Sequence, residues 1–153
     1  MKICVIQGPN LNILGRRENN LYGNMTLENI HEQMKRTAES ANVDIEFFQS
    51  NLEGEIVDKI QESIDDANII IINPAAFTHT SVAIRDALIS SGVPSIEVHI
   101  TNTQKREKFR KRSYISDVCI GKIEGFGPFT YHLAMIAAVQ IANEFEKIKE
   151  VKS

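Results

Sequence analysis

The fold of this chain is set by the stretch Asn68-Ile69-Ile70-Ile71-Ile72-Asn73, an apolar run of strand length. An alternating pattern would indicate a strand with one face in water. A strand that is apolar at every position is instead expected in a parallel sheet whose two faces are both covered by helices. The run therefore predicts a buried central strand of an α/β fold.

Strands and helices alternate on both sides of this run. Further strands are predicted at Ile3–Gln7, Val43–Phe47, Ser95–Ile100 and Asp117–Ile123. Helices are predicted at about Thr26–Ala41, Ile56–Ile64 and Ser81–Ser91, with a long final helix from near Pro128. Such alternation predicts right-handed crossovers and a flavodoxin-like, five-stranded parallel sheet of order 2-1-3-4-5.

Length and composition indicate a single soluble globular domain spanning residues 1–153. The net charge of -3 argues against a dedicated nucleic-acid binder. The first residues do not form a signal peptide, and no apolar run reaches the length of a membrane span. Cys4 and Cys119 both fall in predicted strands that the expected order keeps apart, which excludes a disulfide between them. These features predict a reduced, cytoplasmic setting.

The loop that follows the first strand, from Gly8 to Gly23, is far longer than the about two to six residues that such a connection needs. It carries Arg16, Arg17 and Tyr22. A guanidinium close to a tyrosine favours the phenolate and so makes the tyrosine a better base. The loop is interpreted as a lid or a binding loop, and the alternative is a solvated loop whose arginines and tyrosine serve packing.

Ligands of open parallel sheets bind beyond the carboxyl ends of the strands. Three strand ends and the long loop would bring to this rim Asn10, Asn73, His79, Glu97, His99 and the Arg17/Tyr22 pair. Glu97 and His99 are two positions apart on a strand and so share a face. A carboxylate can orient an imidazole and stabilise its protonated form, as a general acid requires. The alternatives are a structural ion pair for Glu97 and His99 and a helix cap for His79.

Two other histidines are given no role in chemistry. His31 lies among charged residues of a predicted helix and is expected to be solvated, and His132 in the final helix is expected to be structural. The histidines lack metal-ligand spacing and the cysteines are not clustered, so no metal is expected. Gly125-Phe126-Gly127 lacks the third glycine of a dinucleotide fingerprint and is interpreted as a tight turn.

Two segments suggest contacts with other molecules. The basic stretch Lys105–Arg112 fits RNA or phosphate binding, but a solvated helix face explains most of it, with Arg106 or Arg110 entering a pocket. The final helix is apolar on most sides from Leu133 to Ala142, which predicts an oligomer contact as well as a core face. The alternative is a helix packed deep in its own monomer.

Taken together, four parts of the chain closely resemble type II 3-dehydroquinate dehydratase. They are GPNLNILGRRENNLYG (8–23), NPAAFTHTSVAIRDAL (73–88), EVHITN (97–102) followed by REKFRKRSYIS (106–116), and GKIEGFGPFTYHLA (121–134). The resemblance implies a flavodoxin-like subunit assembled as trimers grouped into a dodecamer, without cofactor or metal. It also implies that Asp86 of a neighbouring subunit completes each site.

The resemblance implies a lyase that removes water from 3-dehydroquinate by anti elimination through an enolate. The step serves the shikimate pathway, and quinate breakdown uses it too. Tyr22 would be the base at C2, with Arg17 stabilising its phenolate. Asn10 would stabilise the enolate through an ordered water. His99, oriented by Glu97, would protonate the departing C1 hydroxyl.

The family pattern likewise implies which groups hold the substrate. Asn73 and the backbone amides of Ile100 and Thr101 would bind its carboxylate, and His79 and Arg110 would bind its ring hydroxyls. The chain departs from the common pattern at five positions, and none of the departures removes a proposed catalytic group: Asn19 for proline, Ala75 for glycine, Phe77 for tyrosine, Thr101 for serine and Thr130 for glycine. Ala75 raises the question of how closely backbone and ligand approach there.

Three other functions remain in view. A receiver or flavin-binding module would need an acidic cluster or a hydroxyl-rich phosphate loop after the first strand, and Gly8-Pro9-Asn10 supplies neither. An RNA-binding module would use the basic stretch. A catalytically inactive relative is the third, and the complete set of candidate residues weighs against it.

Overall fold

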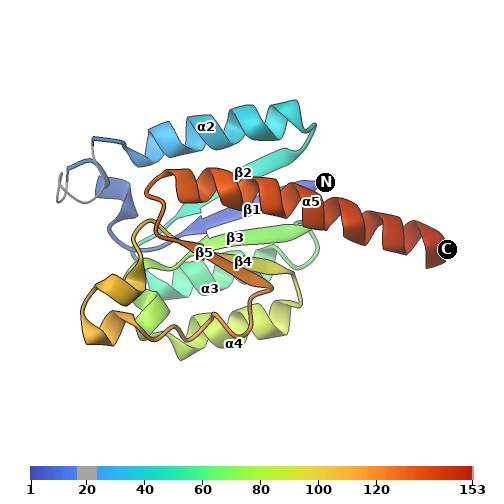
Figure 1. Cartoon of the computed structure of the whole chain (residues 1–153). Helices are drawn as coiled ribbons and strands as arrows, with labels where there is room; N and C mark the ends of the chain where they lie inside the picture. Colours follow the sequence, from blue (N-terminus) through green and yellow to red (C-terminus); the bar gives the residue numbers. More distant parts are fainter. Residues whose placement is uncertain (17–23, 153) are drawn as a thin grey trace.

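The computed structural model describes residues 1–16 and 24–152, which form a parallel sheet between two layers of helices (Figure 1). The strands are β1 Lys2–Gln7, β2 Asp44–Gln49, β3 Ile69–Asn73, β4 Ser95–His99 and β5 Gly121–Glu124. The α-helices are α2 Leu27–Ser40, α3 Glu53–Glu62, α4 Val82–Ser91 and α5 Phe129–Lys152. The sheet order is β2-β1-β3-β4-β5, as predicted.

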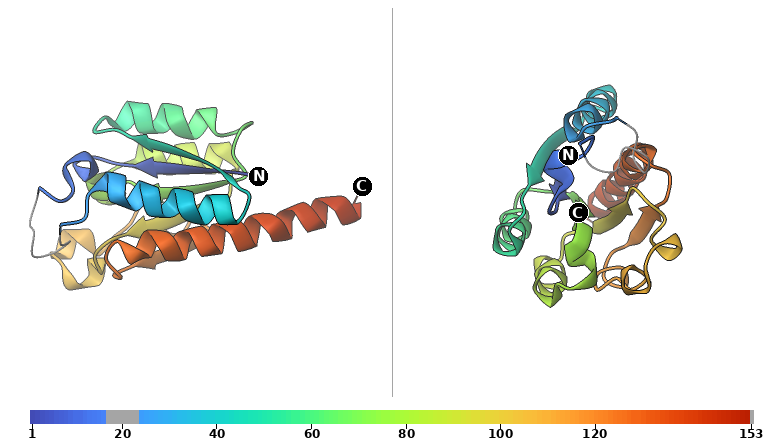
Figure 2. Two further views of the ribbon diagram at one scale, coloured as in Figure 1. Left: turned by 90° about the horizontal axis from the view of Figure 1, so that it is seen from above. Right: turned by 90° about the vertical axis from the view of Figure 1, so that its left-hand side faces the viewer.

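The isoleucine run of β3 supplies both hydrophobic cores. Ile69 and Ile71 pack with α2 and α5 on one face of the sheet, whereas Ile70 and Ile72 pack with α3 and α4 on the other (Figure 2). All four side chains are fully buried. The prediction of a strand covered on both faces is confirmed, and the alternation of side chains along a strand explains how one run serves two cores.

Local capping interactions explain where the predicted helices begin. Thr26 caps α2 in a reciprocal arrangement with Asn29, in which each side chain accepts a hydrogen bond from the other residue's backbone N–H. Ser81 Oγ accepts a hydrogen bond from Ile84 N at 2.9 Å at the start of α4. Gly92 ends α4 with a φ of 64°, in the left-handed region that favours glycine.

The last strand is shorter than predicted. β5 begins at Gly121, and residues 117–120 form a turn and a bend, in which Val118 N and Cys119 N donate hydrogen bonds to Ile115 O at 3.0 Å. The prediction that Cys119 lies in a strand is therefore wrong. Cys4 in β1 and Cys119 are both free thiols, in agreement with the expected absence of a disulfide between them.

The long C-terminal helix α5 has two different faces. Tyr131, Ala134 and Ala138 are buried against the sheet, whereas Ile136 and Ile148 are about half exposed. The helix extends past the edge of the sheet (Figure 1). Within residues 1–16 and 24–152, no helix combines the length and the apolar character needed to cross a membrane.

A tight turn connects β5 to α5, as predicted from its glycines. Gly125 and Gly127 have φ values of 94° and 61°, which only glycine adopts readily. Thr130 Oγ1 accepts a hydrogen bond from Phe126 N at 3.2 Å. The threonine at this position thus stabilises the turn.

Candidate active site

A cavity of about 160 Å³ lies beyond the carboxyl ends of β1, β3 and β4. Its position is the one expected for a ligand site in an open parallel sheet. Residues that follow each of the three strands line it: Pro9, Asn10, Leu11, Leu14, Asn73, Ala75, Ala76, His79, His99, Ile100, Thr101, Thr103, Arg106 and Arg110. The predicted convergence of three strand ends is therefore confirmed.

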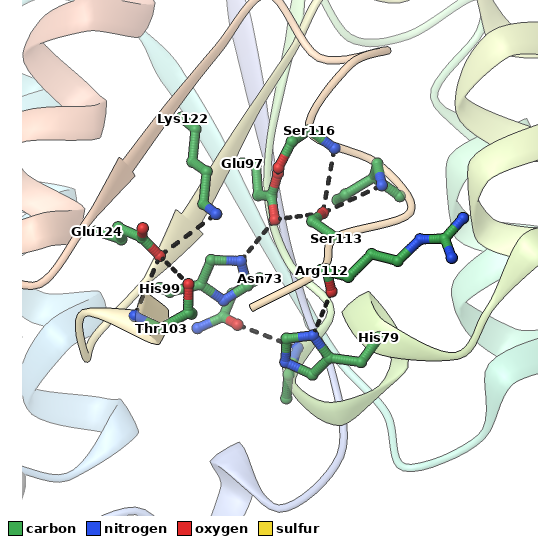
Figure 3. Close-up of polar contacts among 12 residues, drawn as sticks. Asn73, His79, Glu97, His99, Thr103, Arg112, Ser113, Ser116, Lys122 and Glu124 are labelled. Carbon is green, nitrogen blue, oxygen red and sulfur yellow. Dashed lines mark hydrogen bonds and ion pairs between the residues drawn. The ribbon is translucent and has the colours of Figure 1, made fainter. Parts of the chain in front are cut away.

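Glu97 and His99 form a buried pair at the end of β4 (Figure 3). His99 Nε2 lies 2.6 Å from Glu97 Oε1. Because an ionised carboxylate only accepts hydrogen bonds, Nε2 carries the proton that is donated to Glu97. This arrangement leaves Nδ1 as the ring nitrogen that can exchange a proton with a ligand in the cavity.

Two serines complete the shell around Glu97, whose side chain is fully buried. Ser113 Oγ donates a hydrogen bond to Oε1 at 2.8 Å, and Ser116 Oγ donates one to Oε2. Burial by itself would raise the pKa of Glu97, but the hydrogen bonds from His99 and the two serines hold this pKa below its usual range. Glu97 is thus a carboxylate at neutral pH. Sequence reasoning did not single out these serines.

The end of β3 fixes the amide of Asn73. Its Oδ1 accepts a hydrogen bond from Ala75 N at 3.1 Å, and its Nδ2 donates one to the hydroxyl of Tyr131 at 2.9 Å. Ala75 has a φ of 53°, in the left-handed region that costs a residue with a Cβ about 1–2 kcal/mol. Tyr131, a fully buried residue of α5, is another contact that sequence reasoning missed.

His79 faces the cavity from the short helix η2 Ala75–His79. Its Nδ1 lies 2.6 Å from the carbonyl oxygen of Arg112 (Figure 3), so Nδ1 must be the donor. Burial lowers the pKa of His79, and the ring is therefore neutral near pH 7. A neutral ring with its proton on Nδ1 presents Nε2 as an acceptor, which suits a ligand hydroxyl.

The end of β1 requires glycine at position 8. A Cβ on Gly8 would lie 2.2 Å from the carbonyl oxygen of Pro74, since the segments after β1 and β3 approach closely here. Gly8 N donates to Asn73 O at 2.8 Å. Asn10 follows with a φ of 70°, and its N–H donates to Asn51 Oδ1 at 2.9 Å. These contacts place Asn10 at the rim of the cavity, as predicted.

Most of the basic stretch is a solvated helical surface, as expected, with Lys105, Lys108, Lys111 and Arg112 exposed. It folds as two short 3-10 helices, η3 Thr103–Lys105 and η4 Lys108–Arg110. Arg106 and Arg110 line the cavity, in agreement with the prediction that one of them enters a pocket, and Arg110 Nε donates to Glu107 Oε2 at 2.7 Å. The two side chains add positive charge to one wall of the site.

The segment after β4 is anchored to β5. Thr103 Oγ1 donates a hydrogen bond to Glu124 Oε2 at 2.8 Å, and Lys122 forms an ion pair with the same carboxylate (Figure 3). This anchor holds the chain next to Ile100 and Thr101, which line the cavity as predicted.

Not every predicted site residue is brought to this cavity. Asp86, which was predicted to complete the site of a neighbouring subunit, lies on an exposed position of α4 and does not line the cavity of its own subunit. Arg17, Tyr22 and Asn19 fall outside the described residues, so the predictions about them stay predictions. Among residues 1–16 and 24–152, no group of three or more histidine, cysteine or acidic side chains is arranged to hold a metal ion.

The prediction that His31 is solvated is wrong. The imidazole is half-buried, its ring stacks on Phe47 at a centroid distance of 4.0 Å, and its Nε2 lies 2.6 Å from Gln7 Oε1. The sequence suggested a solvated residue because the neighbours of His31 on the helix are charged. Its actual partners, Gln7 and Phe47, come from β1 and β2 and are distant in sequence.

Comparison of the sequence with known proteins identifies a matching family. The family model described as Dehydroquinase class II matches residues 1–139. The 3-dehydroquinate dehydratase of Nitratiruptor sp. is 62% identical over 149 residues, which cover 97% of this chain and 96% of that protein. The 3-dehydroquinate dehydratase of Campylobacter hominis is 60% identical over 153 residues, which cover 100% of this chain and 97% of that protein.

Solved structures agree with the sequence comparisons. The type II dehydroquinase from Butyrivibrio crossotus has a TM-score of 0.88 at 48% identity and covers 90% of this chain and 97% of its own. The type II dehydroquinase from Propionibacterium acnes has a TM-score of 0.87 at 37% identity, with coverage of 91% and 96%.

Proposed function

Because the chain belongs to the class II dehydroquinase family, we propose that it is a lyase that removes water from 3-dehydroquinate to give 3-dehydroshikimate. The proton at C2, which the C3 ketone acidifies, passes to a base and leaves an enolate. The C1 hydroxyl then departs with a proton from an acid, and a double bond forms between C1 and C2. The proposed reaction is an anti elimination that needs no cofactor or metal.

The observation that carries this proposal is the Glu97–His99 pair at the cavity. Hydrogen bonding to the buried carboxylate holds the imidazole in one orientation. His99 would deliver a proton through Nδ1 to the departing hydroxyl. The geometry supplies what a general acid needs, namely a fixed position, a charged partner and contact with the cavity.

The base in this proposal is Tyr22, activated by Arg17. Both residues belong to the segment that follows Arg16 in the sequence, in the same long loop as Asn10. Asn10 would stabilise the enolate through an ordered water, because the developing negative charge on oxygen needs a hydrogen-bond donor. The left-handed backbone at Asn10 supports this role by setting the residue at the rim.

The substrate would be held by groups from two strand ends. Asn73 and the amides of Ile100 and Thr101 would bind its carboxylate. His79, as an acceptor, and Arg110, as a donor, would bind the ring hydroxyls. Their placement around one cavity supports these assignments.

The whole chain would form one catalytic domain of a cytoplasmic homo-oligomer, a tetramer of trimers. The exposed position of Asp86 fits a residue that completes the site of a neighbouring subunit. The half-exposed apolar residues of α5 fit a helix that is partly covered in an assembly. No nucleic-acid or membrane partner is proposed.

Isotope exchange separates the two proton transfers. In D₂O, the His99→Ala variant should still exchange the C2 proton of 3-dehydroquinate while eliminating water at least about a hundredfold more slowly. The Tyr22→Phe variant should lose both exchange and elimination. The controls are His132→Ala and Tyr114→Phe, which remove the same groups outside the proposed machinery. Normal elimination by either active-site variant would contradict the assignments.

A further inference from the structure

A buried chain of polar side chains runs behind Asn73, away from the cavity. Gln7 is the last residue of β1 and pairs with Asn73 in the sheet register. Its amide lies between His31 of α2 and Tyr131 of α5. Gln7 and Tyr131 are almost completely buried. None of these three residues has a part in the chemistry proposed above.

The buried polar side chains behind Asn73 limit the hydrogen bonds that its amide can make. The Asn73 amide carries two N–H groups and one oxygen. Its oxygen accepts from Ala75 N, and one N–H donates to the Tyr131 hydroxyl. One N–H therefore remains, and Asn73 lines the cavity. The direction of that N–H depends on where the Tyr131 oxygen sits.

The Tyr131 hydroxyl also has to donate its own proton. When Gln7 Oε1 faces His31, Gln7 Nε2 has no hydrogen-bond partner among the described residues. The Gln7 amide nevertheless lies close enough to the Tyr131 hydroxyl to oppose the rise in its pKa that burial causes. In this orientation the Gln7 and Asn73 amides both direct N–H groups at the Tyr131 oxygen. The buried O–H of Tyr131 is then left without an acceptor.

Rotating the Gln7 amide by half a turn gives both the Tyr131 hydroxyl and Gln7 Nε2 an acceptor. Gln7 Oε1 then accepts from the Tyr131 hydroxyl, and Gln7 Nε2 donates to His31 Nε2. This direction requires His31 to be neutral with its proton on Nδ1. Burial lowers the pKa of His31, which favours that neutral form. A protonated His31 would instead donate to Gln7 and reverse the direction of the hydrogen bonds between Tyr131, Gln7 and His31.

We propose that Gln7 and Tyr131 are positioning residues that aim the free N–H of Asn73 at the substrate carboxylate, and that neutral His31 sets the direction of the hydrogen bonds. This inference rests on the proposed function, because it takes the carboxylate of 3-dehydroquinate as the group that Asn73 binds. These three residues affect substrate binding and not turnover, since the carboxylate is bound in the ground state and in the transition state alike.

The first test is a double-mutant cycle in the full-length protein. Tyr131→Phe should raise KM for 3-dehydroquinate about tenfold, as expected for weakening one hydrogen bond to a charged group, and leave kcat within about twofold. In the Asn73→Ala background the same change should raise KM by less than about twofold. Additive effects, or an unchanged KM in the single variant, would overturn the inference.

Ser95→Ala is the matched control. It also removes a buried hydroxyl, which donates to Val93 O at 2.9 Å at the start of β4, far along the strand from the cavity. Its KM should equal that of the wild-type protein. An equal rise in KM in this variant would show that Tyr131→Phe acts through general destabilisation, and the inference would fall.

The second test uses His31→Gln, at a half-buried position. The charged groups around the ring are Glu28, Glu32 and Lys35 of α2 itself, while Phe47 of β2 and Gln7 of β1, which face it from the sheet, are uncharged. Glutamine offers Gln7 an acceptor at every pH. The variant should match the wild-type KM at about pH 7.5. Because burial lowers the pKa of His31, its protonation falls at more acidic pH than that of an ordinary histidine, and the variant should have at least about a twofold lower KM at the acidic end of the pH range in which both proteins stay folded.

A ratio of the two KM values that does not change with pH would overturn the role of His31. His79 and His99 are present in both proteins, so their titration cancels in that ratio. Turnover by the wild-type protein tests the proposed function separately. If the wild-type protein converts 3-dehydroquinate and Tyr131→Phe has an unaltered KM, only the present inference is contradicted. If the wild-type protein shows no turnover, the proposed function and the inference are both contradicted.

Discussion

His99 Nε2 lies 2.6 Å from Glu97 Oε1, and the two residues stand on the same face of β4. The carboxylate is fully buried and satisfied by three donors, so the imidazole cannot turn without leaving a buried charge unpaired. The strand spacing and the two serines together determine which nitrogen of His99 faces the cavity.

Replacing Glu97 by glutamine should therefore damage catalysis more than binding. The amide removes the negative charge beside the His99 ring, and its NH₂ group opposes the donors that surround it. We expect kcat to fall about a hundredfold, the usual reach of a general acid, with KM within a few-fold of wild type. Steady-state kinetics measures both. A kcat near that of the wild-type protein would show that the pair is only structural.

The same carboxylate should make the fold sensitive to acid. The pKa of Glu97 is lower in the folded protein than in the unfolded chain, so its contribution to stability is complete above the unfolded value of about 4.3 and is lost as pH falls through the folded value. In urea titrations between about pH 5 and 3, the wild-type protein should lose more stability than Glu97→Gln. Parallel pH profiles of the two proteins would argue against this role.

Ala75 offers a gain in stability. Its φ of 53° strains a residue with a Cβ, and glycine would relieve that strain at a cost in chain entropy. We expect Ala75→Gly to raise the free energy of unfolding by about 1 kcal/mol, or Tm by about 2–4 °C at matched protein concentration. A lower Tm would mean that the backbone here is not strained.

Gly8 and Gly54 make a matched pair for testing the close approach of β1 and β3. A Cβ at Gly8 meets the Pro74 carbonyl at 2.2 Å, whereas a Cβ at Gly54 in α3 meets nothing within 4 Å. Gly8→Ala should destabilise the protein by about 2 kcal/mol or more, and Gly54→Ala should stabilise it by about 0.5–1 kcal/mol. Chemical denaturation of both variants measures the difference. Equal effects would show that the space at Gly8 is not needed.

Much of the fold could be predicted because its signals are local. The isoleucine run, the helical spacing of apolar residues and the positions of Thr26 and Gly92 act within a few residues of each other. The start of β5 was misplaced because Val118, Cys119 and Ile120 are an apolar run like a strand, whereas the backbone turns there, with Val118 N and Cys119 N bonded to Ile115 O.

The candidate site divides in the same way. Residues at strand ends, such as Asn73 and His99, could be placed from the strand pattern and the ligand rule for parallel sheets. Tyr131, Ser113 and Ser116 could not, because their partners lie far away in sequence and only the packing of α5 and of the segment after β4 brings them together. A tyrosine in a helix core or a serine in a turn has no sequence pattern that indicates a hydrogen bond to a site residue.

The central claim is elimination by acid–base groups without a covalent intermediate. The most direct measurement is the ultraviolet absorbance of the purified protein mixed with 3-dehydroquinate, beside a sample treated with borohydride in the presence of substrate and then dialysed. We predict that absorbance of the conjugated enone rises equally in both samples. Loss of the rise after borohydride would reveal a lysine Schiff base, and no rise in either sample from a folded protein would contradict the dehydratase itself.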